Sequence, residues 1–516
     1  MYLKWYYLLL LSVFFCAGFT PLNADDVDCI RYSQFGAVGD GVTDDFDAIA
    51  RAHEAANNAS LPVKADDGAT YYIGGADKTI PIGTDTDWGD ARFIIDDRKV
   101  ENRGKYVFDI VSMLPSIKIT DVKTLEKDQK KIDLSLPYAC LLEATDRETK
   151  RYIREGLNRN NGASQSDVFV VNKNGRVERD TPILWNFDNI SSLVAYPIDN
   201  KTLAVKGGHF TTIANRDESK YTYYSRGIKI SRSNVVVDGV RHEITGEGDH
   251  GSPYRGFILV SRCTEVLVQN SQFSGHKTYR TIGSANAPVS MGSYDISVDH
   301  AVNVTFRNCK QINDIHDTRK WGIFASNYSK NITFDNVEFS RFDAHMGVAN
   351  ATIKNSILGH QGINLIGSGR FLIENSKVCS TNFINLRSDY GSTWEGEIVI
   401  RNCEYIPRNG AVAVLVSGSY SGQHNFGYTC YMPEKITIDG LVIDDADHKS
   451  GYKGPRIFAT FNKAYTSDSY KEKYPYVIAK EVVVKNMVVK SGMPYSVSDN
   501  RYMFRNVVVR DRGKNR

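Results

Sequence analysis

The sequence predicts an all-β solenoid in which short parallel strands stack coil upon coil, and three observations predict it. A nine-residue pattern (NITFDNVEF, NATIKNSIL, RFLIENSKV) recurs about every twenty residues between 320 and 396. Its second and fourth positions are apolar, which is typical of a strand with one buried face. Its sixth position is asparagine or glycine, which is typical of a turn. Because one coil cannot bury its own apolar face, the coils must stack and their ends must be capped.

The same pattern extends over most of the second half of the chain. Copies begin at Asn234, Glu265, Asn303, Asn331, Asn350, Arg370, Glu397, Lys435 and Glu481. The sixth-position asparagines are predicted to lie above one another and to exchange side-chain amide hydrogen bonds; they are Asn270, Asn308, Asn336, Asn355, Asn375, Asn402 and Asn486.

A second strand accompanies most copies of the pattern. These strands are expected at 257–260, 295–298, 362–365, 383–386 and 413–416. A β-propeller would need four strands at a longer and steadier period, whereas the shortest copies here leave room for a single coil. The longer gaps are expected to be loops that wall a groove; they are 274–294, 407–433 and 452–480.

The chain begins with a stretch typical of a secretory signal. Lys4 supplies a positive charge, and residues 5–15 are apolar but too short for a comfortable membrane span. Residues 22–24 (Leu-Asn-Ala) offer a cleavage site, so we expect residues 1–24 to be removed. An uncleaved anchor is the alternative. The remaining protein is expected to be secreted or periplasmic, without a membrane span.

Seven cysteines remain after residue 24, and an odd number leaves at least one unpaired within the chain. Cys309 and Cys403 occupy the pattern position at which other copies have Ser271, Ser356 and Ser376. This exchange indicates a small inward-packed residue and not a disulfide framework. No cysteine or histidine spacing suggests zinc.

A glycine-rich connection, FGAVGDGVTDDFDAI, spans 35–49. Thr43 is expected to cap a helix with Asp44 and Asp45 in its first turn. The run also loosely resembles a calcium loop, but the ligand spacing and terminal glutamate are wrong, so we interpret it as structural.

This stretch closely resembles the N-terminal signature of the pectate-lyase-like right-handed β-helix superfamily. That superfamily includes polygalacturonase-related hydrolases, polysaccharide lyases and phage tailspike depolymerases. The resemblance implies a right-handed parallel β-helix whose N-terminal end is capped by this helix. It is specific for the fold and uninformative about the reaction.

The expected organisation has four parts after the signal. Residues 25–84 form the cap, 85–200 irregular early coils and an inserted subdomain, 201–511 the main β-helix, and 512–516 a basic tail. Within the irregular part, 147–158 is amphipathic and is expected to be helical. The formal net charge of +3 argues against a nucleic-acid binder, which would carry a concentrated basic face.

Candidate catalytic residues alternate along one predicted strand. Arg341, Asp343 and His345 point to one side if Phe342 points inward. An aspartate two residues from a histidine can fix its tautomer and raise its basicity, which suits a general base. A surface ion cluster is the structural alternative.

Further ionisable residues converge on the same side from neighbouring coils. Lys320 lies one coil earlier, and Arg387 and Asp389 lie two coils later. Because stacked strands lie about 5 Å apart, these side chains are expected to share one groove. The substrate-binding candidates on this groove are Arg341, Asn364, Asn385, Tyr390, Trp321, Trp394 and His360. The aromatic rings suit stacking on pyranose faces or packing under loops, and His360 suits a turn hydrogen bond equally well.

Two resemblances suggest different reactions. The order Lys320, Asp343-x-His345, Arg387 resembles mannuronan C5-epimerases and related β-helix lyases, although Ala344 replaces the family proline and Ser340 stands where a catalytic tyrosine is expected. It implies proton abstraction beside a uronate carboxylate that Arg387 or Lys320 neutralises.

The segment 359–369 (GHQGINLIGSG) instead resembles polygalacturonases, which need paired carboxylates. Asp343 with Asp314, Asp317 or Asp389 would supply them. The Asn-Thr-Asp and Arg-Ile-Lys motifs of that family are missing.

The sequence therefore predicts an exported enzyme that cleaves an acidic polysaccharide by β-elimination, with His345 as the base. A glycoside hydrolase that uses paired aspartates is the first alternative, and a C5-epimerase or a non-catalytic glycan-binding β-helix is the second. No cofactor is expected. Calcium is the one metal that the resemblance leaves open, and no compact Asp/Glu triplet on neighbouring coils supports it.

Overall fold

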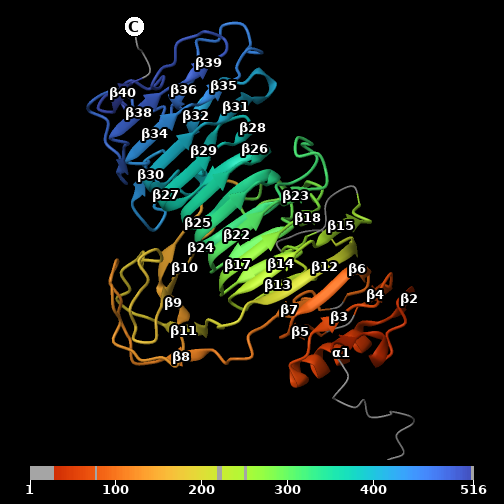
Figure 1. The fold of residues 1–516 in the computed structure, drawn as a ribbon. Helices are drawn as coiled ribbons and strands as arrows, with labels where there is room; N and C mark the ends of the chain where they lie inside the picture. Colours follow the sequence, from red (N-terminus) through yellow and green to blue (C-terminus); the bar gives the residue numbers. More distant parts are fainter. Residues whose placement is uncertain (1–27, 76–77, 101, 218–222, 249–252, 513–516) are drawn as a thin grey trace, which may run out of the picture.

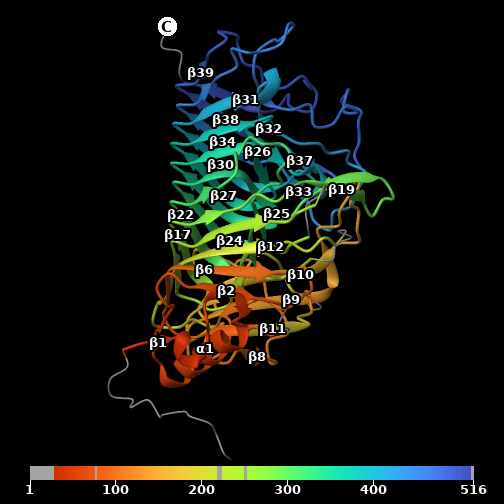
Figure 2. The same ribbon diagram turned by 90° about the vertical axis from the view of Figure 1, so that its right-hand side faces the viewer.

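The computed structural model describes residues 28–75, 78–100, 102–217, 223–248, 253–512. It confirms a right-handed parallel β-helix with an N-terminal helix, and the coils rise from α1 (Phe46–Ala59) at one end to β40 (Val508–Asp511) at the other (Figures 1 and 2). The predicted signal, residues 1–24, and all but the first residue of the predicted basic tail lie outside the described residues. Within the described ranges, no helix has the length and apolar character to cross a membrane.

Each coil contributes strands to three parallel faces. The first face consists of β1 (Ile30–Arg31), β3 (Val63–Lys64), β6 (Thr86–Asp96), β12 (Leu203–Ile213), β14 (Val235–Asp238), β17 (Thr264–Gln269), β22 (Val302–Arg307), β24 (Phe324–Asp335), β25 (Glu338–Lys354), β27 (Gly367–Glu374), β30 (Trp394–Arg401), β34 (Lys435–Asp439), β38 (Glu481–Lys485) and β40.

The second face follows the asparagine turn. It consists of β2 (Asp40–Asp44), β4 (Thr70–Ile73), β15 (Arg241–Thr245), β18 (Gln272–Phe273), β23 (Lys310–Gln311), β26 (Ile357–Leu365), β28 (Lys377–Ser380), β31 (Glu404–Pro407), β35 (Val442–Ile443) and β39 (Val488–Val489), with parts of β6, β12 and β25.

The third face contains β5 (Ile80–Ile82), β7 (Phe108–Ile110), β13 (Ile228–Ile230), β16 (Ile258–Ser261), β21 (Ile296–Asp299), β29 (Ile384–Leu386), β32 (Val414–Ser417) and β36 (Arg456–Phe458), with parts of β24, β25 and β26. All five predicted second strands therefore exist, on this face.

The core is a set of apolar columns inside the stack. The second and fourth positions of the pattern point inward and lie in register, as in Ile332, Ala351 and Phe371 on successive coils. Burying such a side chain stabilises the folded state by roughly 1.5–3 kcal/mol. The alternation predicted from sequence is thus the alternation between core and surface.

The predicted asparagine ladder is confirmed in part: Asn270, Asn308 and Asn336 are linked, and Asn375 donates to Asn355 at 3.4 Å. Asn355 donates instead to Asp335, and Asn486 donates to Asp439. Asn308 Nδ2 donates to Asn270 Oδ1 at 3.1 Å, and Asn336 Nδ2 donates to Asn308 Oδ1 at 2.9 Å. These residues adopt a left-handed backbone conformation, with φ between 51° and 55°. Asparagine tolerates that conformation better than other residues that carry a Cβ, which explains the fixed sixth position.

A second ladder lies where the third face turns into the first, at the starting position of the pattern. Asn331 donates to Asn303 at 2.7 Å and Asn350 donates to Asn331 at 3.1 Å, again from positive φ. In the sequence these asparagines mark where copies of the pattern begin, and a ladder at this position was not predicted. The coils that begin at Asn303, Asn331 and Asn350 are therefore turned by left-handed residues at two corners.

The serine-or-cysteine position packs inward next to the first ladder. Ser356 Oγ donates to Lys354 O at 2.6 Å, and Cys403 Sγ donates to Arg401 O at 3.2 Å, two residues back in both cases. The described cysteines are all free; they are Cys29, Cys140, Cys263, Cys309, Cys379, Cys403 and Cys430. Both residue types thus bond the same local carbonyl.

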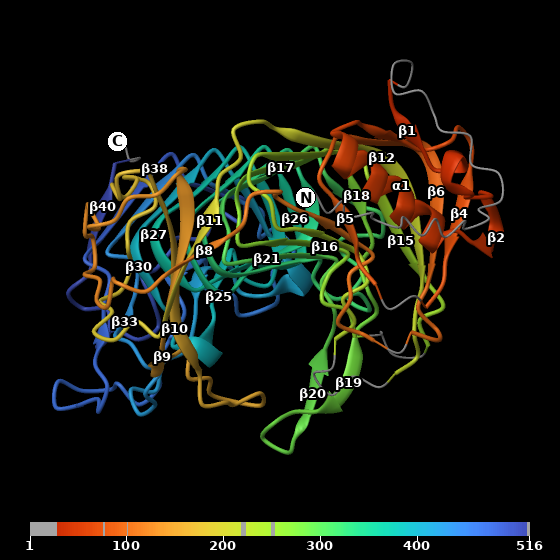
Figure 3. The ribbon, with the colours of Figure 1, turned by 90° about the horizontal axis from the view of Figure 1, so that it is seen from below.

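Helix α1 covers the first coils, as seen from below in Figure 3, and buries Phe46, Ile49 and His53 against them. The predicted start of this helix was wrong. Thr43 belongs to strand β2. Asp45 occupies the N-cap position of the helix, and the acidic residue in the first turn is Asp47. Asp45 instead accepts hydrogen bonds from the backbone N–H groups of Val38 and Gly39, so it holds the glycine-rich connection.

The inserted region forms an antiparallel sheet of its own beside the coils (Figure 1). Its order is β10–β9–β11–β8, with β8 (Ile117–Ile119), β9 (Cys140–Arg151), β10 (Ala163–Val171) and β11 (Ser192–Pro197), and it has a separate apolar core. The helix predicted at 147–158 was wrong, because residues up to Arg151 continue β9 and pair with β10.

Polar contacts, one of them a fully buried ion pair, fasten this sheet to the β-helix. Lys330 Nζ on β24 lies 2.8 Å from Asp167 Oδ1 on β10, and both side chains are buried. Arg262 Nε lies 2.6 Å from Glu143 Oε2, and His300 Nε2 lies 2.9 Å from Ser166 Oγ. The inserted sheet is therefore held along one side of the coils.

All three predicted loop gaps contain short strands. The hairpin β19 (Tyr279–Ile282) and β20 (Pro288–Met291) projects from the first gap, as Figure 3 shows. A parallel pair, β33 (Cys430–Tyr431) and β37 (Tyr476–Val477), joins the other two gaps. Within the described ranges, three short 3₁₀ helices complete the fold: Ser33–Phe35, Ser388–Tyr390 and Arg408–Gly410.

Asn336→Ala is expected to lower the free energy of unfolding by about 2 kcal/mol. The change removes one hydrogen bond and places a Cβ without a local polar partner in the left-handed region. Asn336→Gly should cost about half as much, since glycine keeps the turn. Urea unfolding followed by circular dichroism measures both, and equal losses would show that the turn conformation is not what asparagine supplies.

Candidate functional site

Strand β25 places the predicted catalytic residues on the outside of the coil. Phe342 and Ala344 point into the core, so Arg341, Asp343 and His345 share the other side. Asp343 pairs in register with Asn364 on β26, which pairs in turn with Asn385 on β29, and Asn385 donates to Asn364 at 2.8 Å. The predicted alternation is confirmed.

Asp343 is buried and surrounded by donors. Arg387 Nη1 donates to both carboxylate oxygens at 3.0 and 2.9 Å, Arg341 Nη2 lies 2.7 Å from Oδ2, and the Tyr294 hydroxyl donates to Oδ2 at 2.9 Å. Burial alone would raise the pKa of Asp343, but the two arginines outweigh it and lower the pKa. This carboxylate is ionised at neutral pH.

Asp389 continues the network towards the inserted sheet. It accepts from Arg387 Nη2 at 2.7 Å, and Arg154 Nη2, which follows β9, lies 2.7 Å from the same oxygen. Its pKa is also lowered, because Arg387 and Arg154 outweigh burial. We call the chain Arg341–Asp343–Arg387–Asp389–Arg154 the charged network.

His345 does not pair with Asp343, so the predicted aspartate–histidine pair was wrong. Its Nδ1–H donates to Asn327 Oδ1 at 3.1 Å, and its ring meets Tyr390 edge-on at 5.9 Å. Burial, together with the charge of Arg387, lowers the pKa of His345 to about 3. The imidazole is therefore neutral at physiological pH, and its Nε2 carries the free lone pair.

The other predicted site residues divide into two groups. Trp321 lies beside the network, with the Arg341 guanidinium 5.5 Å from its ring. Lys320 and His360 are not bonded to the network: Lys320 forms no ion pair within the described residues, and His360 Nδ1 donates to Ile315 O at 2.9 Å. The turn hydrogen bond considered for His360 is thus what the structure contains.

Two aromatic residues predicted to contact substrate are buried. Trp394 is 0% exposed and packs against Phe371 in the core, and its Nε1 donates to Gly369 O at 3.1 Å. Tyr390 is 1% exposed under the guanidinium groups of Arg154 and Arg387. The interpretation of these rings as sugar platforms was wrong, because the β30 register turns Trp394 inward and the arginines cover Tyr390.

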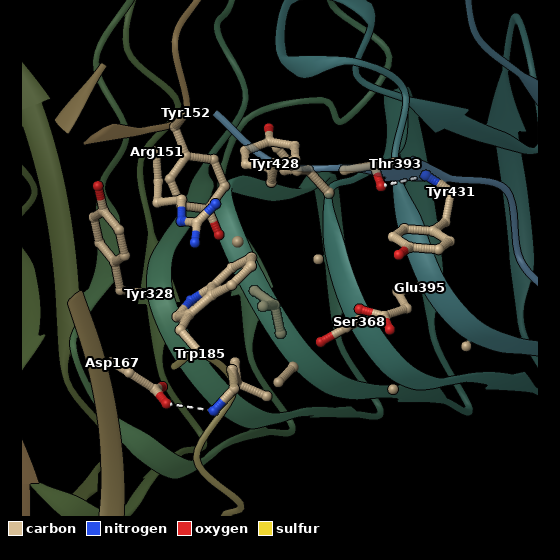
Figure 4. A pocket seen from close by; sticks show the side chains of 18 of the residues that line it. Arg151, Tyr152, Asp167, Trp185, Tyr328, Ser368, Thr393, Glu395, Tyr428 and Tyr431 are labelled. Carbon is tan, nitrogen blue, oxygen red and sulfur yellow. Dashed lines mark hydrogen bonds between the residues drawn. The ribbon is translucent and has the colours of Figure 1, made fainter. Parts of the chain in front are cut away.

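A cleft of about 580 Å³ lies between the inserted sheet and the coils (Figure 4). One wall comes from Arg151, Tyr152 and Trp185 of the inserted region. The floor comes from β25, β27 and β30, and the loop that follows β32 closes the far side. Its aromatic lining consists of Tyr152, Trp185, Tyr328, Tyr428 and Tyr431.

Polar groups alternate with these rings. Glu395 on β30 lies 3.1 Å from Lys127 of the inserted region, across the cleft, and Ser368 lies on the floor. The charged network is adjacent to the cleft, since Tyr390 meets the Tyr152 ring at 6.1 Å and Tyr428 donates to Tyr390 O at 2.7 Å.

Sequence reasoning missed this cleft. Its defining residues, Arg151, Tyr152 and Trp185, lie in the part of the chain without the repeat, and no periodicity placed them near β27. The only available signal was the high tyrosine content, 29 residues in the chain, without an indication of where the rings gather.

A second buried polar cluster lies on the earlier coils and was also not predicted. His276 Nε2 donates to Asp295 Oδ1 at 2.9 Å, His242 Nδ1 donates to Asp295 Oδ2 at 2.8 Å, and His276 Nδ1 lies 3.6 Å from Glu247 Oε1. The adjoining space is about 10 Å³, room for one water molecule at most. We interpret this cluster as structural. In the described part of the chain, no three His, Cys, Asp or Glu residues are grouped so as to hold a metal ion.

Comparison with solved structures places the fold. The tailspike gp61 of Pseudomonas phage phi297 matches with a TM-score of 0.50 and 13% identity, covering 91% of this chain and 84% of that one. The likeness is one of fold. The tailspike gp49 of Pseudomonas phage LKA1 matches with a TM-score of 0.49 and 13% identity, over 93% of this chain and 84% of that one. The Gp54 tailspike of Acinetobacter baumannii bacteriophage AP22 was solved in complex with A. baumannii capsular saccharide. It matches with a TM-score of 0.49 and 12% identity, covering 91% of this chain and 73% of that one.

Sequence comparison is less informative. No family model matches the chain. An uncharacterized 65.4 kDa protein in the cps region of Klebsiella pneumoniae is 50% identical over 46 residues, which is 9% of this chain and 8% of that protein. The chain therefore spans far less than two thirds of that relative.

The buried histidine cluster predicts a loss of stability in alkali. Burial would lower the pKa of His276, but Asp295 and Glu247 outweigh it and raise the pKa to about 9. Because the folded-state pKa lies above the unfolded value of about 6.5, this stabilisation is complete below pH 6.5 and is lost as the pH rises through about 9.

Thermal unfolding between about pH 6.5 and 9.5 measures this loss. The midpoint should fall more steeply for the wild type than for His276→Gln, which has no proton to lose. Parallel curves for the two proteins would contradict the prediction.

Proposed function

We propose that this protein binds a polysaccharide in the cleft between the inserted sheet and the β-helix. The observation that carries the proposal is the lining of that cleft: five aromatic side chains around about 580 Å³, interleaved with hydroxyl and carboxylate groups. This volume is typical of ligand sites, and such sites combine apolar walls with a few fixed polar groups. Aromatic faces pack against the C–H faces of pyranose rings, while polar groups accept and donate to the hydroxyls.

The strands that form the cleft also favour an extended ligand. The floor runs across three successive coils, β25, β27 and β30, which lie about 4.8 Å apart. A chain of sugars lying along the stack would contact one coil after another. The inserted sheet would hold such a chain from the side, because buried ion pairs fix that sheet to the coils.

Cleavage of the bound chain is the second candidate function, and the charged network favours β-elimination over hydrolysis. A glycosidase needs one carboxyl group that is protonated when the reaction begins. The pKa values of Asp343 and Asp389 are both lowered by arginine, so neither supplies that proton. The paired-aspartate hydrolase is therefore the weaker alternative.

His345 is the better candidate for the proton acceptor, although its lowered pKa makes it a weaker base than a free imidazole. Its ring is neutral, Asn327 holds Nδ1, and Nε2 remains as the acceptor. Two residues later, Gly347 lines the cleft, where a Cβ would collide with the Tyr152 hydroxyl. The same base would serve a C5-epimerase, which shares the abstraction step. A non-catalytic glycan-binding role is the remaining alternative. Export from the cell is also proposed, and it rests on residues 1–24.

Filling the cleft should abolish glycan binding. Ser368→Trp places an indole on the cleft floor and is expected to weaken binding of a retained polysaccharide at least tenfold, while Thr318→Trp on an exposed loop should leave binding unchanged. Affinity electrophoresis against uronate and neutral polysaccharides measures this. Equal retention of both variants would place the binding site elsewhere, and a wild type retained by none of the polymers would count against the proposed function.

His345→Gln should lower the rate of cleavage about 10²- to 10⁴-fold while binding persists, because it removes the base and not the cleft. The control is His448→Gln, on an exposed loop near the C-terminal end. Ultraviolet absorbance of unsaturated uronate and reducing ends should rise together in the wild type. Reducing ends rising alone would show hydrolysis and overturn the assignment of His345. Since the pKa of His345 is about 3, protonation of the base should not reduce activity until the pH approaches about 3.

A further inference from the structure

We infer that the cleft selects an acidic sugar, and that Arg151 is the residue that binds its carboxylate. This inference rests on the proposed polysaccharide binding and adds the substrate class. Arg151 is the last residue of β9, and Figure 4 shows its side chain directed into the cleft above Trp185.

The charges of the cleft leave Arg151 without a counter-ion. Each carboxylate that lines the cleft already has a lysine: Lys330 lies 2.8 Å from Asp167, Lys127 lies 3.1 Å from Glu395, and Lys480 lies 2.8 Å from Glu434. Arg151 forms an ion pair with none of the described carboxylates. When these three lysines are counted, of which Lys330 and Lys480 lie outside the lining, Arg151 is one positive charge in excess of the three carboxylates.

Arg151 is held in place by neutral partners. Its Nε donates to Gln165 Oε1 at 2.8 Å, its Nη1 donates to Gly427 O, and its guanidinium lies 4.5 Å from the centre of the Trp185 ring. Gly427 has φ of 87°, and a Cβ there would collide with Lys150 O, so only glycine permits this approach. These contacts fix the guanidinium plane before any ligand arrives.

Donors remain for an anion. Among the described residues, none accepts a hydrogen bond from Nη2, and Nη1 has a second hydrogen. Those N–H groups match the two oxygens of a carboxylate, a pairing that is stronger than neutral hydrogen bonds. Partial burial of the unpaired guanidinium also lowers its pKa, because burial disfavours the charged form. A bound carboxylate would offset this desolvation.

Trp185 supplies the adjoining platform. Arg151 covers one part of the indole and Tyr428 lies 6.4 Å away, so the ring is fixed from two sides. A uronic acid residue that packs on this aromatic surface would bring its carboxylate to the guanidinium. A neutral hexose would gain the packing without the ion pair.

The test compares each acidic polymer with a neutral form of itself. The probes are polygalacturonate, polymannuronate and hyaluronan, each also in carboxyl-reduced form, with dextran sulfate as an anion that lacks carboxylates. Wild-type protein should bind at least one of the three acidic polymers at least tenfold more tightly than its reduced form. Arg151→Gln should lose that preference, and Arg151→Lys should keep only part of it. Arg147→Gln, an exposed arginine on the same strand, should behave as wild type.

The outcomes separate the inference from the function on which it rests. Equal binding of acidic and reduced polymers, an equal response to dextran sulfate, or an unchanged preference in Arg151→Gln would overturn the role of Arg151. Binding of neutral polymers alone would overturn the acidic substrate while polysaccharide binding stands. No binding to any polymer, acidic, reduced or neutral, would count against both. Because the readout is a ratio of affinities, a general loss of folded protein does not imitate the expected result.

Discussion

The left-handed asparagine turn is the constraint on which the rest of the molecule depends. Each coil must change direction within one or two residues while its neighbours above and below do the same in register. Asparagine meets both needs, since it tolerates positive φ and its amide bonds to the residue in the next coil. Once these corners are fixed, the apolar columns align and parallel strands bury their inner faces. The outer faces are then free to differ from coil to coil, and this is where chemistry can be placed.

The second constraint is the attachment of the inserted sheet. A buried pair such as Lys330 and Asp167 stabilises little by itself, because removing both charges from water offsets most of their attraction. Breaking it by removing one partner would cost far more. The main effect of the Lys330–Asp167 pair is therefore to fix the position of the inserted sheet against the coils. The cleft exists only in that position. The aromatic rings of the two units meet because of it.

The fold was predictable because it repeats. Positions such as Ile332 and Asn336 recur in copy after copy, so a period read from the sequence becomes a position in space. The N-terminal helix shows the limit of local patterns: Asp45 suits a first turn by type, yet it bonds the backbone of Val38 and Gly39 across the connection. The strand at 147–151 shows the same limit, since pairing with β10 overrides an amphipathic helical pattern.

The site was predictable only in part, because only some of its residues belong to the repeat. Asp343 lies on β25 and Arg387 directly follows β29, so their meeting followed from the register of these strands. Their partners did not: Tyr294 comes from a loop, and Arg154 comes from the inserted region far away in sequence. The cleft depends entirely on such distant segments. The convergence of charged residues in the sequence therefore located the charged network. It could not predict the contacts from distant segments, and those contacts decide whether the network is catalytic or structural.

The charged network and the cleft are mechanically one unit, and this limits how mutations in either can be interpreted. Arg154, on the segment that follows β9, bonds Asp389, and Arg151, three residues earlier, is the last residue of β9. The backbone N–H of Glu155 also donates to Asp389 O at 3.0 Å, so residue 389 holds the segment through both its side chain and its main chain. Replacing Asp389 would release Arg154 and shift the wall that presents Arg151 and Tyr152. Loss of activity in such a variant would follow from a displaced wall as readily as from a missing catalytic group. Changes confined to His345, which bonds Asn327 and none of these residues, separate the two causes because they leave the wall in place.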